Sequence, residues 1–276
     1  MAWQIKLLNS VIKCLVISSF LCGVPLYAKS KANPITATSY AVMDLNTGTM
    51  LKEQNSEEVR SIASITKIMT AMVILDAGTD LSDLVKVERI KGIKSKLQHG
   101  LTVSKSTLLH ITLMSSDNLA AKLLAKHYLG GEDAFIAKMN EKAQSLGMTH
   151  TQFTDPTGLL DTNISTAQDL IKLISHAATY ETILKYSTSD HASIEIPGKK
   201  RSTLVNYGTT NRLVKKYKDI IISKTGWIQK SGGCLIMLVQ GQDHKRAIIV
   251  LNSRNTHTRI LEGDLLYGMY NNGKNF

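Results

Sequence analysis

The stretch that decides the fold reads Ser61-Ile62-Ala63-Ser64-Ile65-Thr66-Lys67, and an apolar run follows it as far as Leu75. No residue between Lys67 and Asp76 is charged, and nearly all of them are apolar. A helix that is apolar on every side is normally buried, so the run predicts a helix through a domain core, beginning near Ser64. The serines at its entrance are residue types that commonly cap a helix.

Ser64 and Lys67 are three residues apart, which places both on one face of the first helical turn. A serine hydroxyl is a weak nucleophile until a neighbouring base activates it. Burial lowers the pKa of a lysine because it disfavours the charged form, so a lysine in a dry site can accept a proton near neutral pH. The helix N-terminus adds partial positive charge beside the attacking oxygen. The pair is therefore a candidate nucleophile and base, although Ser-x-x-Lys spacing alone is common by chance.

Charge and composition narrow the possible partners. The chain of 276 residues carries a net charge of +11, which favours an anionic partner, either a nucleic acid or an anionic surface or polymer. The lysines and arginines are scattered and lack the interleaved aromatic residues of a single-strand-binding protein, which argues against nucleic acid. The histidines and cysteines show no metal-ligand spacing, so we expect neither a metal nor another cofactor.

Residues 1–28 are typical of a secretory signal peptide. Lys6 and Lys13 lie near the start, and an apolar stretch with small residues ends at Ala28. This stretch is short for a membrane span, so we expect no integral membrane domain; an uncleaved anchor is the alternative. Removal of the peptide leaves a net charge of about +9 and Cys234 as the one remaining cysteine, which excludes an internal disulfide and predicts a buried thiol in a strand.

The order of the expected elements indicates an α+β fold in one domain, residues 39–270, between a polar linker (29–38) and a polar tail (271–276). The elements are a hairpin over 39–52, the buried helix, loops with short strands over 79–103, helices over 104–114, 119–129 and 132–147, turns over 148–161, a helix over 165–179, strands at 194–196, 220–224, 234–239 and 247–251, and a helix over 258–270. Ser104 is an expected N-cap, and Ser165 with Gln168 has the form of a capping box. The hairpin should join the later strands in one antiparallel sheet.

Two further motifs follow the Ser-x-x-Lys segment. Ser116-Asp117-Asn118 lies in a break between two helices, and Lys224-Thr225-Gly226 closes an apolar strand. Each alone is common, since loops are rich in serine and asparagine and many strands end on a charge. Together and in this order, the three motifs are the signature of serine β-lactamases and penicillin-binding proteins.

Other segments extend this similarity. The chain resembles the low-molecular-mass penicillin-binding proteins, the D-alanyl-D-alanine carboxypeptidase family of serine peptidases, over about residues 38–268. The segments that carry the resemblance outside the second and third motifs are 41–48, 62–71, 153–159, 165–170 and 210–213. Within the family, residues 113–121 and 223–227 resemble the D-alanyl-D-alanine endopeptidase branch, penicillin-binding protein seven; the carboxypeptidase branch more often has Ser-Gly-Asn at the second motif.

The resemblance implies the serine β-lactamase/penicillin-binding-protein transpeptidase-like fold, an antiparallel sheet with a helical cluster. It also implies a periplasmic peptidase of cell-wall biogenesis and cell shape that acts on peptidoglycan peptides through an acyl-enzyme, with β-lactam antibiotics as covalent inhibitors. Ser64 would attack, Lys67 would act as the base, and Ser116 would relay a proton to the leaving amine. The residues implied in substrate binding, including the oxyanion hole, are Asn118, Lys224, Thr225, Gly226 and Trp227. Lys224 would also help to keep Lys67 neutral.

The reaction expected from this resemblance is endopeptidase cleavage of D-alanyl-diaminopimelate cross-links. The alternatives are trimming of a terminal D-alanine, a β-lactamase, and a non-catalytic wall-binding protein. A class A β-lactamase would carry a Glu-x-x-Leu-Asn segment that activates the deacylating water, and residues 120–180 contain none. A wall-binding protein would have no use for the lysines of the motifs.

Overall fold

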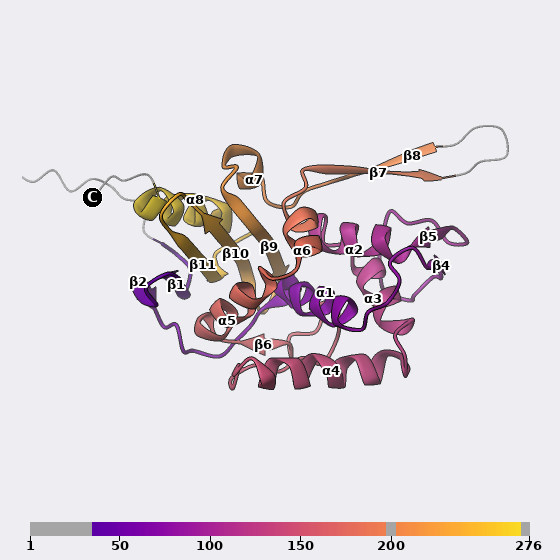
Figure 1. Cartoon of the computed structure of the whole chain (residues 1–276), viewed down its shortest axis with the longest axis horizontal. Coiled ribbons are helices and arrows are strands. Elements are labelled where there is room, and N and C mark those ends of the chain that lie inside the picture. Colours follow the sequence, from indigo (N-terminus) through magenta and orange to yellow (C-terminus); the bar gives the residue numbers. More distant parts are fainter. Residues whose placement is uncertain (1–34, 197–202, 272–276) are drawn as a thin grey trace, which may run out of the picture. The chain divides into compact units, whose positions relative to one another are not determined.

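A computed structural model describes residues 35–196 and 203–271 of the chain (Figure 1). The predicted signal peptide, residues 29–34 of the predicted linker and residues 272–276 of the predicted tail lie outside the described residues. The last residues of the predicted linker pack against the folded domain. The backbone N–H of Ala37 donates to Glu262 Oε1 at 3.1 Å, and Ala37 is buried.

The central element is a five-stranded antiparallel sheet in the order β2-β1-β11-β10-β9. Its strands are β1 (Ser39–Asp44), β2 (Thr49–Gln54), β9 (Ile220–Ile228), β10 (Gly232–Gln240) and β11 (Lys245–Ser253). The first hairpin joins the later strands because β1 pairs with β11, from Ser39 opposite Leu251 to Asp44 opposite Arg246. The predicted antiparallel sheet is confirmed, and β9, which carries the third motif, lies at one edge of it.

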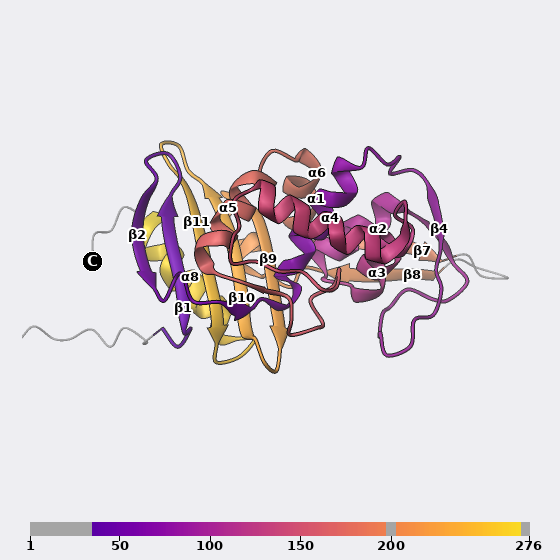
Figure 2. The same cartoon turned by 90° about the horizontal axis from the view of Figure 1, so that it is seen from below.

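Both faces of the sheet are covered (Figure 2). Leu235 and Met237 of β10 pack with Leu266 of α8 (Thr258–Asn271), whereas Cys234 and Ile236 belong to the core beneath the other helices. This alternation follows from the two-residue repeat of a strand, and it explains why β10 reads as one continuous apolar run. Cys234 is buried and unpaired in β10, as predicted.

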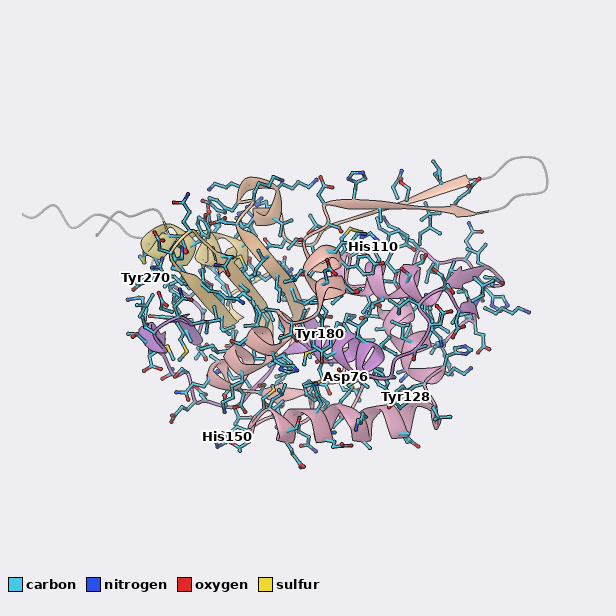
Figure 3. All side chains as sticks on the ribbon, viewed as in Figure 1. Asp76, His110, Tyr128, His150, Tyr180 and Tyr270 are labelled. Carbon is cyan, nitrogen blue, oxygen red and sulfur yellow. The ribbon has the colours of Figure 1, made fainter. Side chains whose placement is uncertain are left out.

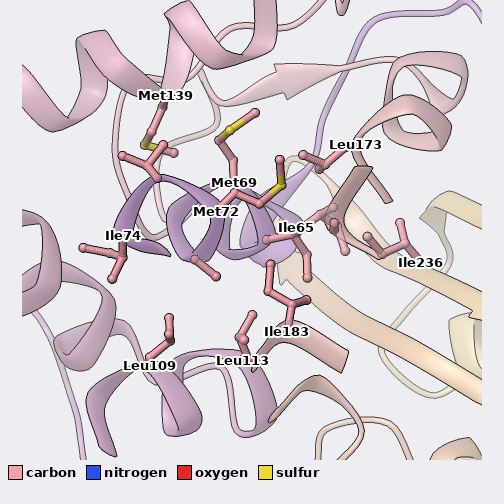
Figure 4. Packing of buried hydrophobic residues seen from close by; sticks show 14 of the residues in the cluster. Ile65, Met69, Met72, Ile74, Leu109, Leu113, Met139, Leu173, Ile183 and Ile236 are labelled. Atoms are coloured by element: carbon pink, nitrogen blue, oxygen red, sulfur yellow. The ribbon is translucent and has the colours of Figure 1, made fainter. Parts of the chain in front are cut away.

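The buried helix is α1 (Lys67–Asp76), and a 3₁₀ turn, η1 (Ala63–Thr66), precedes it. Every residue from Lys67 to Ile74 is buried, which confirms the predicted core helix. Figure 4 shows side chains of neighbouring elements around it, including Met139, Leu113 and Leu173. The expected serine cap is wrong, because neither η1 nor α1 has a side-chain hydrogen bond at its N-cap.

Asp76 attaches the far end of α1 to its neighbours (Figure 3). Its carboxylate accepts a hydrogen bond from Tyr180 Oη at 2.6 Å and forms an ion pair with Lys142 Nζ at 2.8 Å. Lys142 belongs to α4 and Tyr180 precedes α6. These contacts stabilise the position of the helix that carries Lys67 at its other end.

The remaining elements agree in part with the sequence analysis. They are helices α2 (Lys105–Met114), α3 (Asn118–Lys126), α4 (Gly131–Ser145), α5 (Ala167–Ala177), α6 (Glu181–Ser187) and α7 (Leu213–Lys216), and strands β3 (Arg60–Ser61), β4 (Leu84–Lys86), β5 (Thr102–Ser104), β6 (Ile164–Ser165), β7 (His191–Ile196) and β8 (Thr203–Gly208). Ser104 caps α2 by accepting from Thr107 N at 3.1 Å, as predicted. Within the described residues, no helix combines the length and the apolar character that a bilayer crossing requires.

The predicted capping box at the start of α5 is wrong by one residue. Thr166, not Ser165, is the N-cap, and its hydroxyl accepts from Asp169 N at 3.1 Å. Ser165 belongs to β6, where it pairs with Arg60. Gln168 instead donates to Ser56 Oγ. The pairing of β6 therefore shifts the beginning of the helix.

Candidate active site

Two close backbone approaches hold Ser64 in place. A Cβ on Gly226 of β9 would lie 2.9 Å from Ser64 N, and one on Gly158 would lie 2.0 Å from Ala63 O. Gly158 also has φ +76°, a conformation that favours glycine. Ala63 itself has φ +46°, so the turn before the candidate nucleophile is strained. Gly226 thus makes room for the Ser64 backbone, a structural role in addition to the substrate-binding role that the resemblance implies.

Ser64 and Lys67 contact each other directly. Lys67 Nζ lies 2.9 Å from Ser64 Oγ and donates to Asn118 Oδ1 at 2.7 Å. The carbonyl oxygen of Thr157 accepts a hydrogen bond from Lys67 Nζ and another, at 3.3 Å, from Ser64 Oγ. The first and second motifs therefore meet at the lysine ammonium, and a backbone carbonyl joins them there.

The environment of Lys67 favours a neutral amine. The side chain is fully buried, and this burial lowers its pKa from 10.5 to about 7, against the opposing attraction of Asp155 and Asp117. A lysine with this pKa is a neutral base in a large fraction of molecules at physiological pH. The lowered pKa therefore allows the Lys67 amine to accept the Ser64 proton near neutral pH.

Asp155 positions the carbonyl of Thr157. One oxygen, Oδ1, accepts hydrogen bonds from Thr157 N at 2.5 Å and Gly158 N at 2.9 Å, and the other accepts from Leu160 N at 2.9 Å. The sequence indicated this segment as a turn and as part of the family resemblance, but assigned no residue of it to the site. The functional group is a main-chain carbonyl, which no residue type identifies, although the Asp-Pro-Thr-Gly turn could have pointed to a fixed backbone here.

The second lysine of the site pairs with the second motif. Lys224 Nζ donates to Ser116 Oγ and to Thr225 O, both at 2.8 Å. Ser116 has φ +62°, a strained conformation that sets its side chain in the break between α2 and α3. Burial lowers the pKa of Lys224 well below its usual value, and repulsion from Lys67 and Arg259 lowers it further. Burial is the largest cause of the lowered pKa of both lysines. The expected effect of Lys224 on the protonation of Lys67 is therefore secondary at most.

Thr225, Gly226 and Trp227 are consecutive residues of the edge strand β9. Thr225 is buried and its hydroxyl donates to Thr210 Oγ1 at 2.7 Å, whereas Trp227 is about half exposed. Arg259 of α8, which the sequence analysis missed, donates from Nη1 to the carbonyl of Gly226. It lies far along the chain in an ordinary helix, so only the packing of α8 on the sheet reveals it.

The structure thus brings all the predicted site residues to one region, where β9, η1 and the α2–α3 break meet. In the part of the chain that the structure describes, no three His, Cys, Asp or Glu side chains are grouped so that they could hold a metal ion. The chemistry available here is that of a serine, two lysines with lowered pKa values, and backbone amides.

Comparison with known proteins shows the family of the chain. Residues 27–255 match the peptidase family described as D-alanyl-D-alanine carboxypeptidase. The chain belongs to this family. It is 38% identical to the D-alanyl-D-alanine endopeptidase of Escherichia coli (strain K12) over 250 residues, which cover 87% of this chain and 79% of that protein.

Solved structures support the same assignment to the D-alanyl-D-alanine carboxypeptidase family. The DD-transpeptidase of Streptomyces K15 superposes with a TM-score of 0.79 at 27% identity, over 86% of this chain and 98% of that chain. Penicillin-binding protein D2 of Listeria monocytogenes, in its cefotaxime-bound form, superposes with a TM-score of 0.74 at 26% identity, over 84% of this chain and 96% of that chain. The chain is a serine-type peptidase with the predicted penicillin-binding-protein fold.

Proposed function

We propose that the chain is an endopeptidase that cleaves the cross-link between a D-alanyl residue and the side-chain amine of diaminopimelate on a neighbouring peptidoglycan stem peptide. The observation that carries the proposal is the contact of 2.9 Å between Lys67 Nζ and Ser64 Oγ, made by a lysine whose pKa burial lowers to about 7. The similarity to the Escherichia coli endopeptidase over most of both chains supports the choice of reaction within the family.

In the acylation step, Ser64 Oγ forms a bond to the D-alanyl carbonyl carbon and the carbon–nitrogen bond breaks. The serine proton passes to the neutral amine of Lys67. Ser116 relays a proton to the leaving amine: its own hydrogen passes to the nitrogen, and its oxygen takes a replacement proton from Lys224 Nζ, which already donates to it at 2.8 Å. The products are an ester on Ser64 and a stem peptide with a free amine.

The negative charge that develops on the carbonyl oxygen needs nearby donors, and the backbone N–H groups of Ser64 and Trp227 are proposed for this role. The closeness of Gly226 to Ser64 N supports it, because β9 then passes directly beside the nucleophile. Asn118 uses its oxygen to accept from Lys67, which leaves its amide N–H₂ to donate to the substrate backbone.

Lys224 and Thr225 are proposed to bind the carboxylate on the carbon that bears the leaving amine. Both side chains are buried at the edge strand, where a charge-assisted hydrogen bond to a carboxylate is strong. An incoming carboxylate also favours the charged form of Lys224, whose pKa is low in the empty site.

Water hydrolyses the acyl-enzyme to complete the cycle. Since residues 120–180 lack the glutamate segment of class A β-lactamases, we expect an acyl-enzyme formed with a β-lactam to be long-lived. β-Lactams are therefore proposed as covalent inhibitors, and the cefotaxime-bound form of the Listeria relative supports this.

Removal of a terminal D-alanine is the second candidate reaction. The family description names a D-alanyl-D-alanine carboxypeptidase, and a terminal D-alanine presents a carboxylate that Lys224 and Thr225 could bind equally well. We further propose that residues 1–28 direct secretion to the periplasm and that residues 39–270 form the peptidase domain. The +9 charge of the mature chain suits an anionic wall polymer.

The test is to incubate the purified mature chain with disaccharide-peptide dimers joined by a D-alanyl-diaminopimelate bond, and to follow the products by chromatography and mass spectrometry. We expect monomers from the chain and none from its Ser64→Ala variant. Release of D-alanine from pentapeptide monomers, with the dimers left intact, would favour the second candidate. Intact dimers and pentapeptides together would reject both.

A further inference from the structure

A second recess adjoins the proposed active site. A cavity of about 500 Å³ lies between the 94–96 loop, the break between α2 and α3, and the end of β8. Ser116 and Asn118 line it, so it adjoins the site directly, and Gly208 lines it as well. We call it the lysine-rimmed cavity because Lys94 and Lys96 also line it.

The charged side chains that line this cavity are Lys94, Lys96 and Asp117, so their net charge is positive. Lys94 is exposed and has no hydrogen-bond or ion-pair partner among the described side chains. Lys96 donates to Asn206 O at 2.9 Å and lies 5.5 Å from the centre of the Tyr207 ring, which holds its ammonium group in place. The carboxylate of Asp117 is already occupied, since it accepts from Ala120 N at 2.9 Å and from Ser95 Oγ at 2.6 Å.

Tyr207 lines the same cavity. It is 4% exposed, and within the described part of the chain its buried hydroxyl makes no well-formed hydrogen bond, although the Ser95 side chain lies within reach of it. A buried hydroxyl without a partner costs stability, so such a group is normally satisfied by something else, either water or a ligand. The cavity therefore combines two ammonium groups with a phenolic hydroxyl that makes no well-formed hydrogen bond, which is a set suited to a carboxylate.

The position of the cavity relates it to the leaving group. Ser116, which we propose to protonate the leaving amine, lies on its wall. Gly208 precedes Thr210 by two residues, and the Thr210 hydroxyl contacts Thr225 at the proposed carboxylate site. A substrate whose leaving amine lies at Ser116 would thus continue into the lysine-rimmed cavity.

We infer that the lysine-rimmed cavity binds the leaving stem peptide of a cross-linked dimer and so selects cross-links over terminal D-alanine. The inference rests on the proposed endopeptidase function. A leaving D-alanine is small and has one carboxylate, which Lys224 and Thr225 already serve. A leaving stem peptide carries further carboxylates and needs a larger volume. The lysine-rimmed cavity supplies the volume, and Lys94, Lys96 and Tyr207 supply donors for the carboxylates.

The experiment compares Lys94→Glu and Tyr207→Phe with the unchanged mature chain. Lys94 is exposed, and Tyr207→Phe keeps the aromatic ring and removes only the hydroxyl, so both variants should fold. Lys91→Glu is the matched control, because Lys91 is an exposed lysine of the same loop that does not line the cavity. Two rates are measured for each protein: kcat/KM on the cross-linked dimer, and acylation by a fluorescent penicillin, which has no leaving stem peptide.

We expect Lys94→Glu to lower kcat/KM on the dimer about tenfold and Tyr207→Phe to lower it about threefold. These losses are the size expected when one or two exposed or neutral polar interactions are removed. Penicillin acylation should stay within about twofold of the unchanged chain, and Lys91→Glu should change neither rate. Equal dimer cleavage by all the variants, or an equal loss in both rates, would overturn the inference. If the unchanged chain is acylated but leaves the dimer intact, the proposed endopeptidase function itself fails, and the inference fails with it.

Discussion

Acidification from pH 8 to pH 5 should charge Lys67 and remove the base from the Ser64–Lys67 pair. The two atoms are 2.9 Å apart, and in the charged state the lysine can still donate to Ser64 Oγ but cannot take its proton. The rate of acylation should therefore follow the neutral fraction of Lys67.

The magnitude follows from the pKa of about 7 that burial gives this lysine. The neutral fraction is about one half at pH 7 and about one in a hundred at pH 5, whereas a lysine with the usual pKa would be neutral in fewer than about one molecule in a thousand at pH 7. The lowered pKa means that the charged form of Lys67 is about 5 kcal/mol less favourable, relative to the neutral form, in the folded protein than in water. Acylation should thus fall about tenfold per pH unit below pH 6 and level off above pH 8.

The assay is the second-order rate of labelling by a fluorescent penicillin, measured from pH 5 to pH 9 at constant ionic strength. Circular dichroism at each pH shows whether the chain stays folded. A rate that is constant between pH 5 and pH 8 in folded protein would refute the assignment of Lys67 as the base. A rate that keeps rising about tenfold per pH unit up to pH 9, without levelling off, would show that burial does not lower its pKa in this way.

Two further outcomes follow from the packing around the site. In a denaturant titration, Gly158→Ala should lower the free energy of unfolding by about 2–4 kcal/mol, because its Cβ would meet Ala63 O at 2.0 Å, and it should abolish penicillin labelling. The control is Gly48→Ala, at a glycine with φ +72° and open space around it. This variant should lower the free energy of unfolding by only about 1 kcal/mol. Cys234 should resist a thiol reagent in the folded chain and react at once in denaturant, since burial raises its thiol pKa; rapid reaction of the native chain would contradict the described burial.

The nucleophile and base could be predicted because their geometry is local. Ser64 and Lys67 are one helical turn apart, so their spacing alone places them side by side, and the apolar run after them predicts burial of the lysine. The hairpin and the strands were predictable for a similar reason, since turn residues and apolar runs mark them along the chain.

The parts that could not be predicted depend on long-range packing. The carbonyl of Thr157 and the guanidinium of Arg259 reach the site only because a turn and α8 pack there. The helices α6 and α7 are too short for their periodicity to stand out. At α5 both Ser165 and Thr166 could cap a helix, and only the pairing of Ser165 in β6 decides between them.

The most direct test of the acyl-enzyme mechanism is to label the mature chain with a fluorescent penicillin, digest it, and locate the label by mass spectrometry, with Ser64→Ala treated in parallel. The mechanism predicts one label per chain, attached to the peptide that contains Ser64, stable for many minutes and lost in the variant. A label on another residue, or equal labelling of the variant, would contradict the role of Ser64 as the nucleophile.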